Sequence, residues 1–166
     1  MRIALVIPVG LFLACHNPEL TLKDLKVTLD ALSAEEQQTI RRAQLRVHSS
    51  RPGPERAEAI GELGMVLHAH GFIDAAARCG DKAAVAAPGE FRWHYYAARA
   101  HIESFNYVAA LAALDRALAL DAGYEPAWTA KGRVLLLLGH LEEAKGAYTS
   151  AGALNPNSAV ALSGLA

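Results

Sequence analysis

Histidine and cysteine are the residues of this 166-residue chain that could bind a metal ion or attack a substrate, and their spacing argues against both roles. The two cysteines, Cys15 and Cys79, are too far apart to form a Cys-x-x-Cys metal or redox motif. His68 and His70 are two residues apart, so their side chains would point in different directions from a helix. The sequence therefore predicts no metal site and no cofactor.

Catalytic motifs are also absent from the sequence. It contains no GxSxG nucleophile elbow, no HExxH zinc motif and no GxxxxGK[ST] phosphate loop. Cys79 follows Arg78, which could activate a thiolate, but a cysteine inside a helix is more often an inert small side chain. We therefore expect a protein without enzymatic activity of its own.

Charge and composition narrow the possible folds and partners. The 16 Lys and Arg residues nearly balance the 17 Asp and Glu residues, so the chain lacks the basic surplus typical of nucleic-acid binding. Hydrophobic residues make up 52% of the chain and aromatic residues only 7%, with Ala and Leu abundant, which favours helices over a β-sandwich or barrel. We predict an all-α protein that does not bind nucleic acid.

Small residues recur every 34 residues in the second part of the chain. Four columns share one register: Gly64, Ala98 and Gly132; Ala76, Ala110 and Ala144; Ala83, Ala117 and Ala151; Pro88, Ala122 and Pro156. This pattern resembles the tetratricopeptide repeat (TPR), which forms two antiparallel helices per unit. The resemblance implies an all-α solenoid over residues 55–166, with units at 57–90, 91–124 and 125–158 and a partial fourth unit at 159–166.

The residue types within each unit have a packing reason. Small residues at positions 8 and 20 let the helices approach closely, and larger ones at positions 4, 11 and 24 fill the space between hairpins. Gly80 departs from this pattern at position 24, where we expect a gap that Cys79 fills in part. His94 and His101 hold positions 4 and 11, where a packed core histidine is more typical than a metal ligand.

The resemblance also implies a concave groove that is lined by the first helix of each unit and binds a protein or peptide partner. Arg99 and Arg133 hold the same position in successive units, and with Arg92 and Tyr95 nearby they suit a carboxylate-bearing or extended peptide. The alternative for such exposed arginines is a plain solvated face. The groove residues that we predict are Met65, His68, Arg92, Tyr95, Arg99, Thr129 and Arg133.

Two features qualify the predicted groove. The carboxylate clamp that some TPR proteins use for chaperone tails needs Lys and Asn where this chain has Gly61 and Met65, so we do not expect that specificity. The aromatic run from Phe91 to Tyr96 lies at the start of the second unit. We expect some of these rings to face the groove, although packing in the core is the more common role for such rings.

A short apolar segment precedes the repeats. After a positively charged start, residues 3–14 carry no charge and are too few to span a bilayer. The four residues ending at Cys15 read Phe-Leu-Ala-Cys and resemble the lipobox of bacterial lipoprotein signal peptides, with Phe where Leu is commonest. The resemblance implies that residues 1–14 are a signal peptide and that lipid on Cys15 anchors the protein in the membrane. If the source is Gram-negative, the resemblance also implies that His16, where Asp would favour the inner membrane, favours the outer membrane facing the periplasm. The alternative is a buried N-terminal helix or a start codon further along the chain.

Residues 15–54 are predicted to form a helical hairpin and a linker. Leucines at helical spacing predict a first helix over Leu20–Leu32, and Ser33 with Glu36 forms a capping box that begins a second helix ending near His48. The stretch 49–54 contains two prolines around a glycine and is the expected linker.

The last part of the chain carries no charge after Lys145. The uncharged face from Gly146 to Ala166 is expected either to contact a partner, such as a second copy of the chain, or to continue into a longer protein. We interpret the sequence as a membrane-anchored TPR scaffold of the bacterial cell envelope. The alternative is the regulatory or targeting segment of a larger enzyme or redox protein that continues past Ala166.

Overall fold

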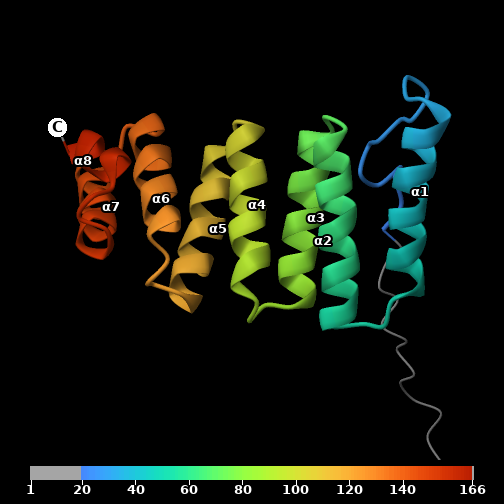
Figure 1. Cartoon of the computed structure of the whole chain (residues 1–166), viewed down its shortest axis with the longest axis horizontal. Helices are drawn as coiled ribbons and strands as arrows, with labels where there is room; N and C mark the ends of the chain where they lie inside the picture. Colours follow the sequence, from blue (N-terminus) through green and yellow to red (C-terminus); the bar gives the residue numbers. More distant parts are fainter. Residues whose placement is uncertain (1–19, 166) are drawn as a thin grey trace, which may run out of the picture.

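The computed structural model of the chain is a single row of packed α-helices (Figure 1). It describes residues 20–165, which form eight helices and no strand, as the prediction of an all-α fold requires. Neighbouring helices pack side by side, and α1 and α8 lie at opposite ends of the row. The helices are α1 (Ala34–Ser49), α2 (Pro54–Ala69), α3 (Ile73–Ala86), α4 (Phe91–Glu103), α5 (Tyr107–Leu120), α6 (Glu125–Leu137), α7 (Leu141–Leu154) and α8 (Ala159–Leu165).

Each 34-residue unit contains one helix pair, and the same turn ends the first helix of each pair. In the first unit the Phe72 amide donates to the Leu67 carbonyl at 2.9 Å, and Gly71 between them has a φ of 81°. This is the Schellman motif, in which a left-handed residue lets two late carbonyls find donors. The equivalent bonds run from the Asn106 amide to the His101 carbonyl at 2.8 Å and from the His140 amide to the Leu135 carbonyl at 2.9 Å.

The left-handed position of this turn is a glycine in the first and third units. Gly71 and Gly139 have φ values of 81° and 80°, whereas the second unit places Phe105 there with a φ of 60°. The Phe105 side chain is 76% exposed. A left-handed backbone is costly for a residue with a Cβ atom, so this turn is strained in the second unit alone.

Close approach of the helices explains several glycines inside them. A Cβ atom on Gly132 would lie 2.8 Å from the ring of Tyr148, and one on Gly80 would lie 2.7 Å from the Cα atom of Ala97. The gap that we expected at Gly80 is therefore absent. Because Gly80 has no side chain, α4 packs directly against the backbone of α3 there.

Residues 20–33 form an irregular segment, so the prediction of a helix over Leu20–Leu32 is wrong. A single turn ends where Lys26 adopts a φ of 53° and the Val27 amide donates to the Leu22 carbonyl at 2.9 Å. After this turn Val27 and Leu29 are buried, whereas Thr28 and Asp30 are exposed. Apolar side chains of this segment join the core between α1, α2 and α3: Leu20, Leu25, Val27 and Leu29.

The predicted capping box at the start of α1 is confirmed. The Ser33 amide donates to Oε2 of Glu36 at 2.8 Å, and the Glu36 amide donates to Oγ of Ser33 at 3.3 Å. These bonds satisfy two amides that a helix start leaves without partners. The predicted hairpin is thus one capped helix preceded by a packed irregular segment.

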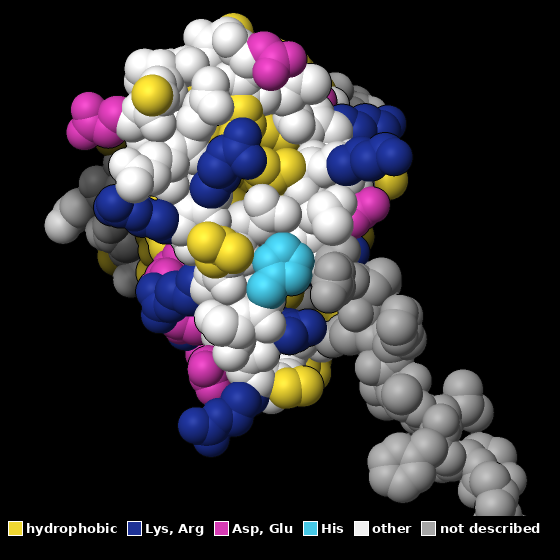
Figure 2. All heavy atoms as spheres, turned by 90° about the vertical axis from the view of Figure 1, so that its right-hand side faces the viewer, with side chains coloured by type: hydrophobic (Ala, Val, Ile, Leu, Met, Phe, Trp, Pro, Cys, Tyr) yellow, Lys and Arg dark blue, Asp and Glu magenta, His cyan; other side chains and the backbone are white. Residues whose placement is uncertain are grey.

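The ends of the row differ in charge. Figure 2 looks onto the α1 end, where Lys and Arg side chains lie among hydrophobic ones, whereas no charged residue follows Lys145 at the other end. The proposed signal peptide, residues 1–14, and Cys15 lie outside the described residues. Within residues 20–165, no helix is both long and apolar enough to cross a membrane.

Candidate peptide-binding groove

The first helices of the three units, α2, α4 and α6, present the predicted groove residues, and we call this surface the A-helix face. Contacts between α2 and α4 hold its first part together. Besides the seven predicted residues, the A-helix face includes two carboxylates that are not among the predicted binding residues: Glu58 on α2 and Glu103 on α4.

Arg92 links α4 to α2 through an ion pair. Its guanidinium binds the carboxylate of Glu58, with Nη1 donating to Oε1 at 3.3 Å, and lies 4.3 Å above the ring of Trp93. Trp93 is 4% exposed and packs on Gly61, where a Cβ atom would lie 2.1 Å from ring atom Cζ3. The ring of Trp93 therefore covers the face beside Gly61, and Arg92 is engaged within the protein.

A second contact between α2 and α4 centres on Glu103. Its Oε2 lies 2.6 Å from Nε2 of His68, and its Oε1 lies 3.8 Å from Nη2 of Arg99. The carboxylate is therefore within hydrogen-bond distance of His68 and forms a longer ion pair with Arg99. Around them is a cavity of about 240 Å³, which Tyr95 and Tyr96 also line.

Tyr96 closes the inner side of this cavity. Its hydroxyl is buried and has no hydrogen-bond partner among the described residues. Burial raises the pKa of the Tyr96 hydroxyl well above its ordinary value. The hydroxyl therefore stays protonated in the physiological range and can donate a hydrogen bond.

Three aromatic rings form a cluster at the start of α4 and α6. Phe91 stacks on Tyr95 with ring centroids 5.7 Å apart, and Tyr124 meets their edges at 4.9 Å and 5.1 Å. These rings are half-buried, whereas Trp93 is in the core. The aromatic run is therefore divided between the core and the A-helix face.

The α6 part of the face has fewer internal contacts. Thr129 donates its hydroxyl proton to Oε1 of Glu125 at 2.6 Å, and Arg133 is exposed and forms no ion pair with any of residues 20–165. No ion pair between these described residues links α4 to α6, and the two helices meet through the ring of Tyr95 on α4 and that of Tyr124, the residue before α6. Leu136, one helical turn beyond Arg133 on α6, is 41% exposed.

The seven predicted residues therefore separate into groups. His68, Tyr95 and Arg99 line one cavity, whereas Arg92 is bound to Glu58. Thr129 and Arg133 lie on α6, and Met65 is 46% exposed on α2, with α4 between these two helices.

Neither Glu58 nor Glu103 was predicted as a binding residue, although the sequence contains a signal for each. Glu103 follows Arg99 by four residues, a spacing at which opposite charges pair on a helix. Glu58 and Arg92 hold the same position of successive units, so that neighbouring first helices bring them together.

The remaining candidate chemical groups are held in structural contacts. Nε2 of His101 lies 2.9 Å from Oδ2 of Asp81, and Nε2 of His94 lies 2.9 Å from the Pro88 carbonyl oxygen. Burial raises the pKa of the Cys79 thiol to about 12, which leaves it a poor nucleophile. Among the described residues no three His, Cys, Asp or Glu side chains are grouped so that they could hold a metal ion.

The geometry is that of a helical-repeat solenoid whose A-helix face carries exposed charged and aromatic side chains. Comparisons with known proteins indicate which type of repeat it resembles. Residues 101–166 match the family model described as Tetratricopeptide repeat. This match covers the second half of the array, and the 34-residue helix pairs have the fold of TPR solenoids, in agreement with the resemblance seen in the sequence. No curated protein matches the chain in sequence.

Solved structures share this fold. The crystal structure of MamA superimposes with a TM-score of 0.70 at 23% identity, over 79% of this chain and 75% of that chain. The first TPR of Spaghetti (RPAP3), bound to the HSP90 peptide SRMEEVD, gives a TM-score of 0.63 at 28% identity, over 68% of this chain and 89% of that chain. The first TPR domain of human RPAP3 gives 0.61 at 29% identity, over the same shares.

Proposed function

We propose that the protein is an interaction scaffold that binds an extended segment of a partner protein on the A-helix face, between α4 and α6. The observation that carries the proposal is the contrast along this face. Ion pairs link α2 to α4 around the cavity of about 240 Å³, whereas no ion pair between the described residues joins α4 to α6, which meet through the rings of Tyr95 and Tyr124. The part between α4 and α6 contains an aromatic surface at Tyr95 and the exposed cation of Arg133.

The chemistry of this part favours a segment with a carboxylate and an apolar side chain. A guanidinium binds a carboxylate through two parallel hydrogen bonds, and the exposed Leu136 offers an apolar contact next to Arg133. The Spaghetti domain, which resembles this chain, was solved with an acidic peptide bound. That precedent supports a peptide partner, while the residues of the chaperone clamp are absent at Gly61 and Met65.

The test is a peptide-display selection on the whole chain, followed by measurement of Kd for the selected peptide. Arg133→Ala should weaken binding at least about tenfold, because a charge-assisted hydrogen bond contributes roughly 1.5–3 kcal/mol. Tyr95→Ala should weaken it as well. Arg42→Ala on the exposed surface of α1 is the matched control and should leave Kd unchanged. Equal affinity in all three variants would place binding elsewhere.

We further propose that the scaffold is lipid-anchored through Cys15 in the bacterial cell envelope, at the outer membrane facing the periplasm. The support is the sequence alone, where residues 3–14 and the Phe-Leu-Ala-Cys motif resemble a lipoprotein signal. Several acyl chains on one cysteine suffice for stable anchoring. In a Gram-negative host the protein should incorporate labelled palmitate and enter the membrane fraction, and Cys15→Ser should lose both properties. A soluble, unlabelled protein that still begins at Met1 would contradict the anchor.

Association of copies through the uncharged residues 146–166 is a separate proposal. Leu154, Val160 and Leu162 are exposed in α7 and α8. If they contact a second copy, Leu162→Asp should lower the molar mass measured by sedimentation. An unchanged mass would reject this contact.

A further inference from the structure

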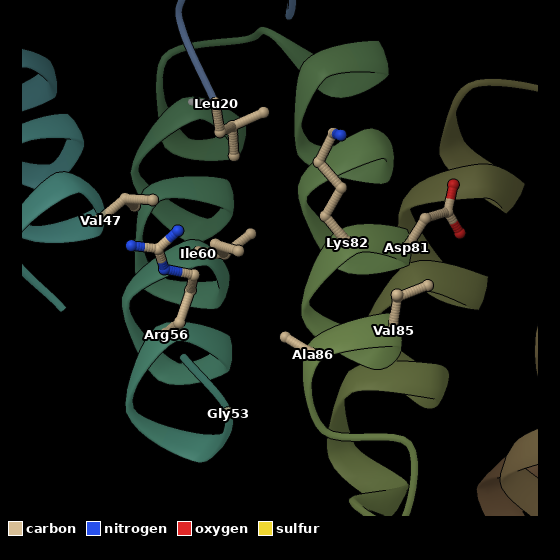
Figure 3. Close-up of a pocket in the computed structure, with 9 residues that line it drawn as sticks. All are labelled: Leu20, Val47, Gly53, Arg56, Ile60, Asp81, Lys82, Val85 and Ala86. Atoms are coloured by element: carbon tan, nitrogen blue, oxygen red, sulfur yellow. The ribbon is translucent and has the colours of Figure 1, made fainter. Parts of the chain in front are cut away.

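A cavity of about 350 Å³ lies near the α1 end of the row, where α1, α2 and α3 meet the segment before α1 (Figure 3). Most of its lining is apolar and comes from all three helices and that segment: Leu20, Val47, Ile60, Val85 and Ala86. Small-molecule sites in proteins have volumes of about 300–1,000 Å³ and apolar walls with a few polar groups. The size and lining of this cavity are therefore those of a site for a small ligand.

Two cationic side chains line the cavity from different helices. Figure 3 shows Arg56 extending from α2 and Lys82 from α3, with Ile60 between them in this view. Neither cation forms an ion pair with any of residues 20–165. The cavity therefore presents positive charge that no ion pair within the described part of the chain neutralises.

Two carboxylates of the described chain could compete for these cations, and both are bound to other groups. Asp81 lines the cavity, but in Figure 3 its carboxylate extends away from α2, and both of its oxygens lie within 3.1 Å of Nε2 of His101. Asp24, on the segment before α1, accepts hydrogen bonds at Oδ2 from the amide and the hydroxyl of Thr21, at 3.0 Å and 2.7 Å. The cations are therefore available to an anion that enters the cavity.

The guanidinium of Arg56 is positioned by the backbone that joins α1 to α2. Its Nη2 donates to the carbonyl oxygen of Ser50, the buried residue that ends α1, at 3.0 Å. Its Nε is buried and has no hydrogen-bond partner among the described residues. A guanidinium has more N–H donors than this one bond uses, and it binds a carboxylate through two of them in parallel. Arg56 is thus held in place with donors left for an anion.

The pair of cations is particular to the first unit. At the positions of Arg56 and Lys82, the other two units have pairs that are not both cationic: Glu90 with Arg116, and Tyr124 with Ser150. The helix pairs of those units form without two cations at these positions, so packing of the repeat does not account for the pair.

We propose that this cavity binds a small carboxylic acid with an aliphatic chain, such as a medium-chain fatty acid. The carboxylate binds the guanidinium of Arg56, and the chain lies against the apolar walls. Lys82 adds a second positive charge, which favours the ionised acid. The residues that line the cavity are not those of the A-helix face, so this site does not depend on the proposed binding of a peptide.

The test is isothermal titration calorimetry of octanoate into the full chain carrying Cys15→Ser, a form that has no lipid on residue 15 and needs no detergent. One octanoate should bind per chain. Octanol, which has a similar chain without the charge, should bind at least about tenfold more weakly. Hexanoate should bind about fifteenfold more weakly than octanoate, because it buries two fewer CH₂ groups.

Variants of the two cations test the position of the carboxylate. Arg56→Met keeps an apolar stem without the guanidinium and should weaken octanoate binding at least about tenfold. Lys82→Met should weaken it about threefold, and this variant should keep the fold because Lys82 is exposed. Arg116→Met is the matched control, because Arg116 is also exposed and holds the position of Lys82 in the next unit. It should leave the affinity unchanged.

Several results would overturn the proposal. One is octanoate binding that does not saturate or that exceeds one molecule per chain. Others are octanol binding as tight as that of octanoate, an Arg56→Met protein that binds octanoate like the wild type, and a Lys82→Met protein that binds it like the Arg116→Met control. An acetylated Ala-Ala-Leu tripeptide with a free carboxylate is titrated in parallel. If it binds more tightly than octanoate, the cavity takes a protein C-terminus, and the proposal of a small acid is wrong.

Discussion

Replacing Gly80 by Ala in the middle of α3 has two opposing effects on stability, a gain in helix propensity and a loss from overpacking against α4. Alanine is the better helix former by about 1 kcal/mol. The new Cβ atom, however, would lie 2.7 Å from the Cα atom and 3.0 Å from the amide nitrogen of Ala97. These are backbone atoms of α4, so a side-chain rotation cannot relieve the contact. Overpacking costs roughly 1–3 kcal/mol, and we expect a net loss of about 1 kcal/mol in the free energy of unfolding.

The matched control is Gly146→Ala in α7. No atom outside the helix's own backbone lies within 4 Å of the Cβ position at Gly146, so the helix propensity acts alone. The control should gain about 1 kcal/mol, which places the two variants about 2 kcal/mol apart. Urea unfolding followed by circular dichroism at 222 nm measures both. A Gly80→Ala protein as stable as the wild type would refute the close packing of α3 on α4.

Four further predictions follow from single residues. Phe105→Gly should stabilise the protein by about 1 kcal/mol by relieving the left-handed turn, and an unchanged unfolding midpoint would contradict the strain. Glu103→Gln should tighten binding of an acidic peptide because it releases Arg99, whereas unchanged Kd would show that this carboxylate does not compete. Cys79, whose pKa burial raises to about 12 from an ordinary 9.0, should resist iodoacetamide at pH 8 in the native chain and react in urea. The thiolate of Cys79 forms at a lower pH in the unfolded chain than in the folded one, so the free energy of unfolding falls as pH rises above 9.0. Rapid labelling of the native chain would contradict the burial of Cys79. Ser33→Ala should cost about 1 kcal/mol and return the lowered pKa of Glu36 toward its ordinary 4.5 in an NMR titration. The hydrogen bonds to ionised Glu36 stabilise the fold above pH 4.5, and this stabilisation is lost as the pH falls through the lowered pKa of Glu36. Identical Glu36 titration curves in the wild type and in Ser33→Ala would exclude the cap.

The helix pairs could be predicted because their determinants are local and repeated. Small residues at a fixed 34-residue spacing indicate where two helices touch, and the Ser33 and Glu36 pair marks a helix start without knowledge of the rest of the fold. Gly80 shows the limit of this reasoning. Its position favoured a larger side chain, and only the path of α4 reveals that the backbone of Ala97 occupies that space.

The segment before α1 could not be predicted in the same way. Leu25 and Leu29 are buried, as a helix with the four leucines on its inner face would also require. Val27, which lies off that predicted helical face, is buried as well, whereas Leu22 and Leu32 are only half-buried. In the irregular conformation Leu25, Val27 and Leu29 all join the core with residues of α1, α2 and α3, and these tertiary contacts are not encoded in a local pattern.

The sequence predicted which helices hold the candidate residues, but it predicted neither Glu103 nor the contacts between units. The resemblance to TPR proteins placed Tyr95, Arg99 and Arg133 on the first helices of their units, and the structure has them on α4 and α6. Which arginines are engaged depends on partners in other units. Arg92 meets Glu58 across 34 residues, and Arg133 has no such carboxylate among the described residues.

Mapping the binding surface by NMR tests the central proposal most directly. A peptide selected on the whole chain is titrated into the ¹⁵N-labelled protein, and the amide shifts are followed residue by residue. We expect the largest shifts in α4 and α6, around Tyr95, Thr129 and Arg133, and their loss in Arg133→Ala. Shifts confined to other helices, or shifts that persist unchanged in Arg133→Ala, would contradict binding between α4 and α6.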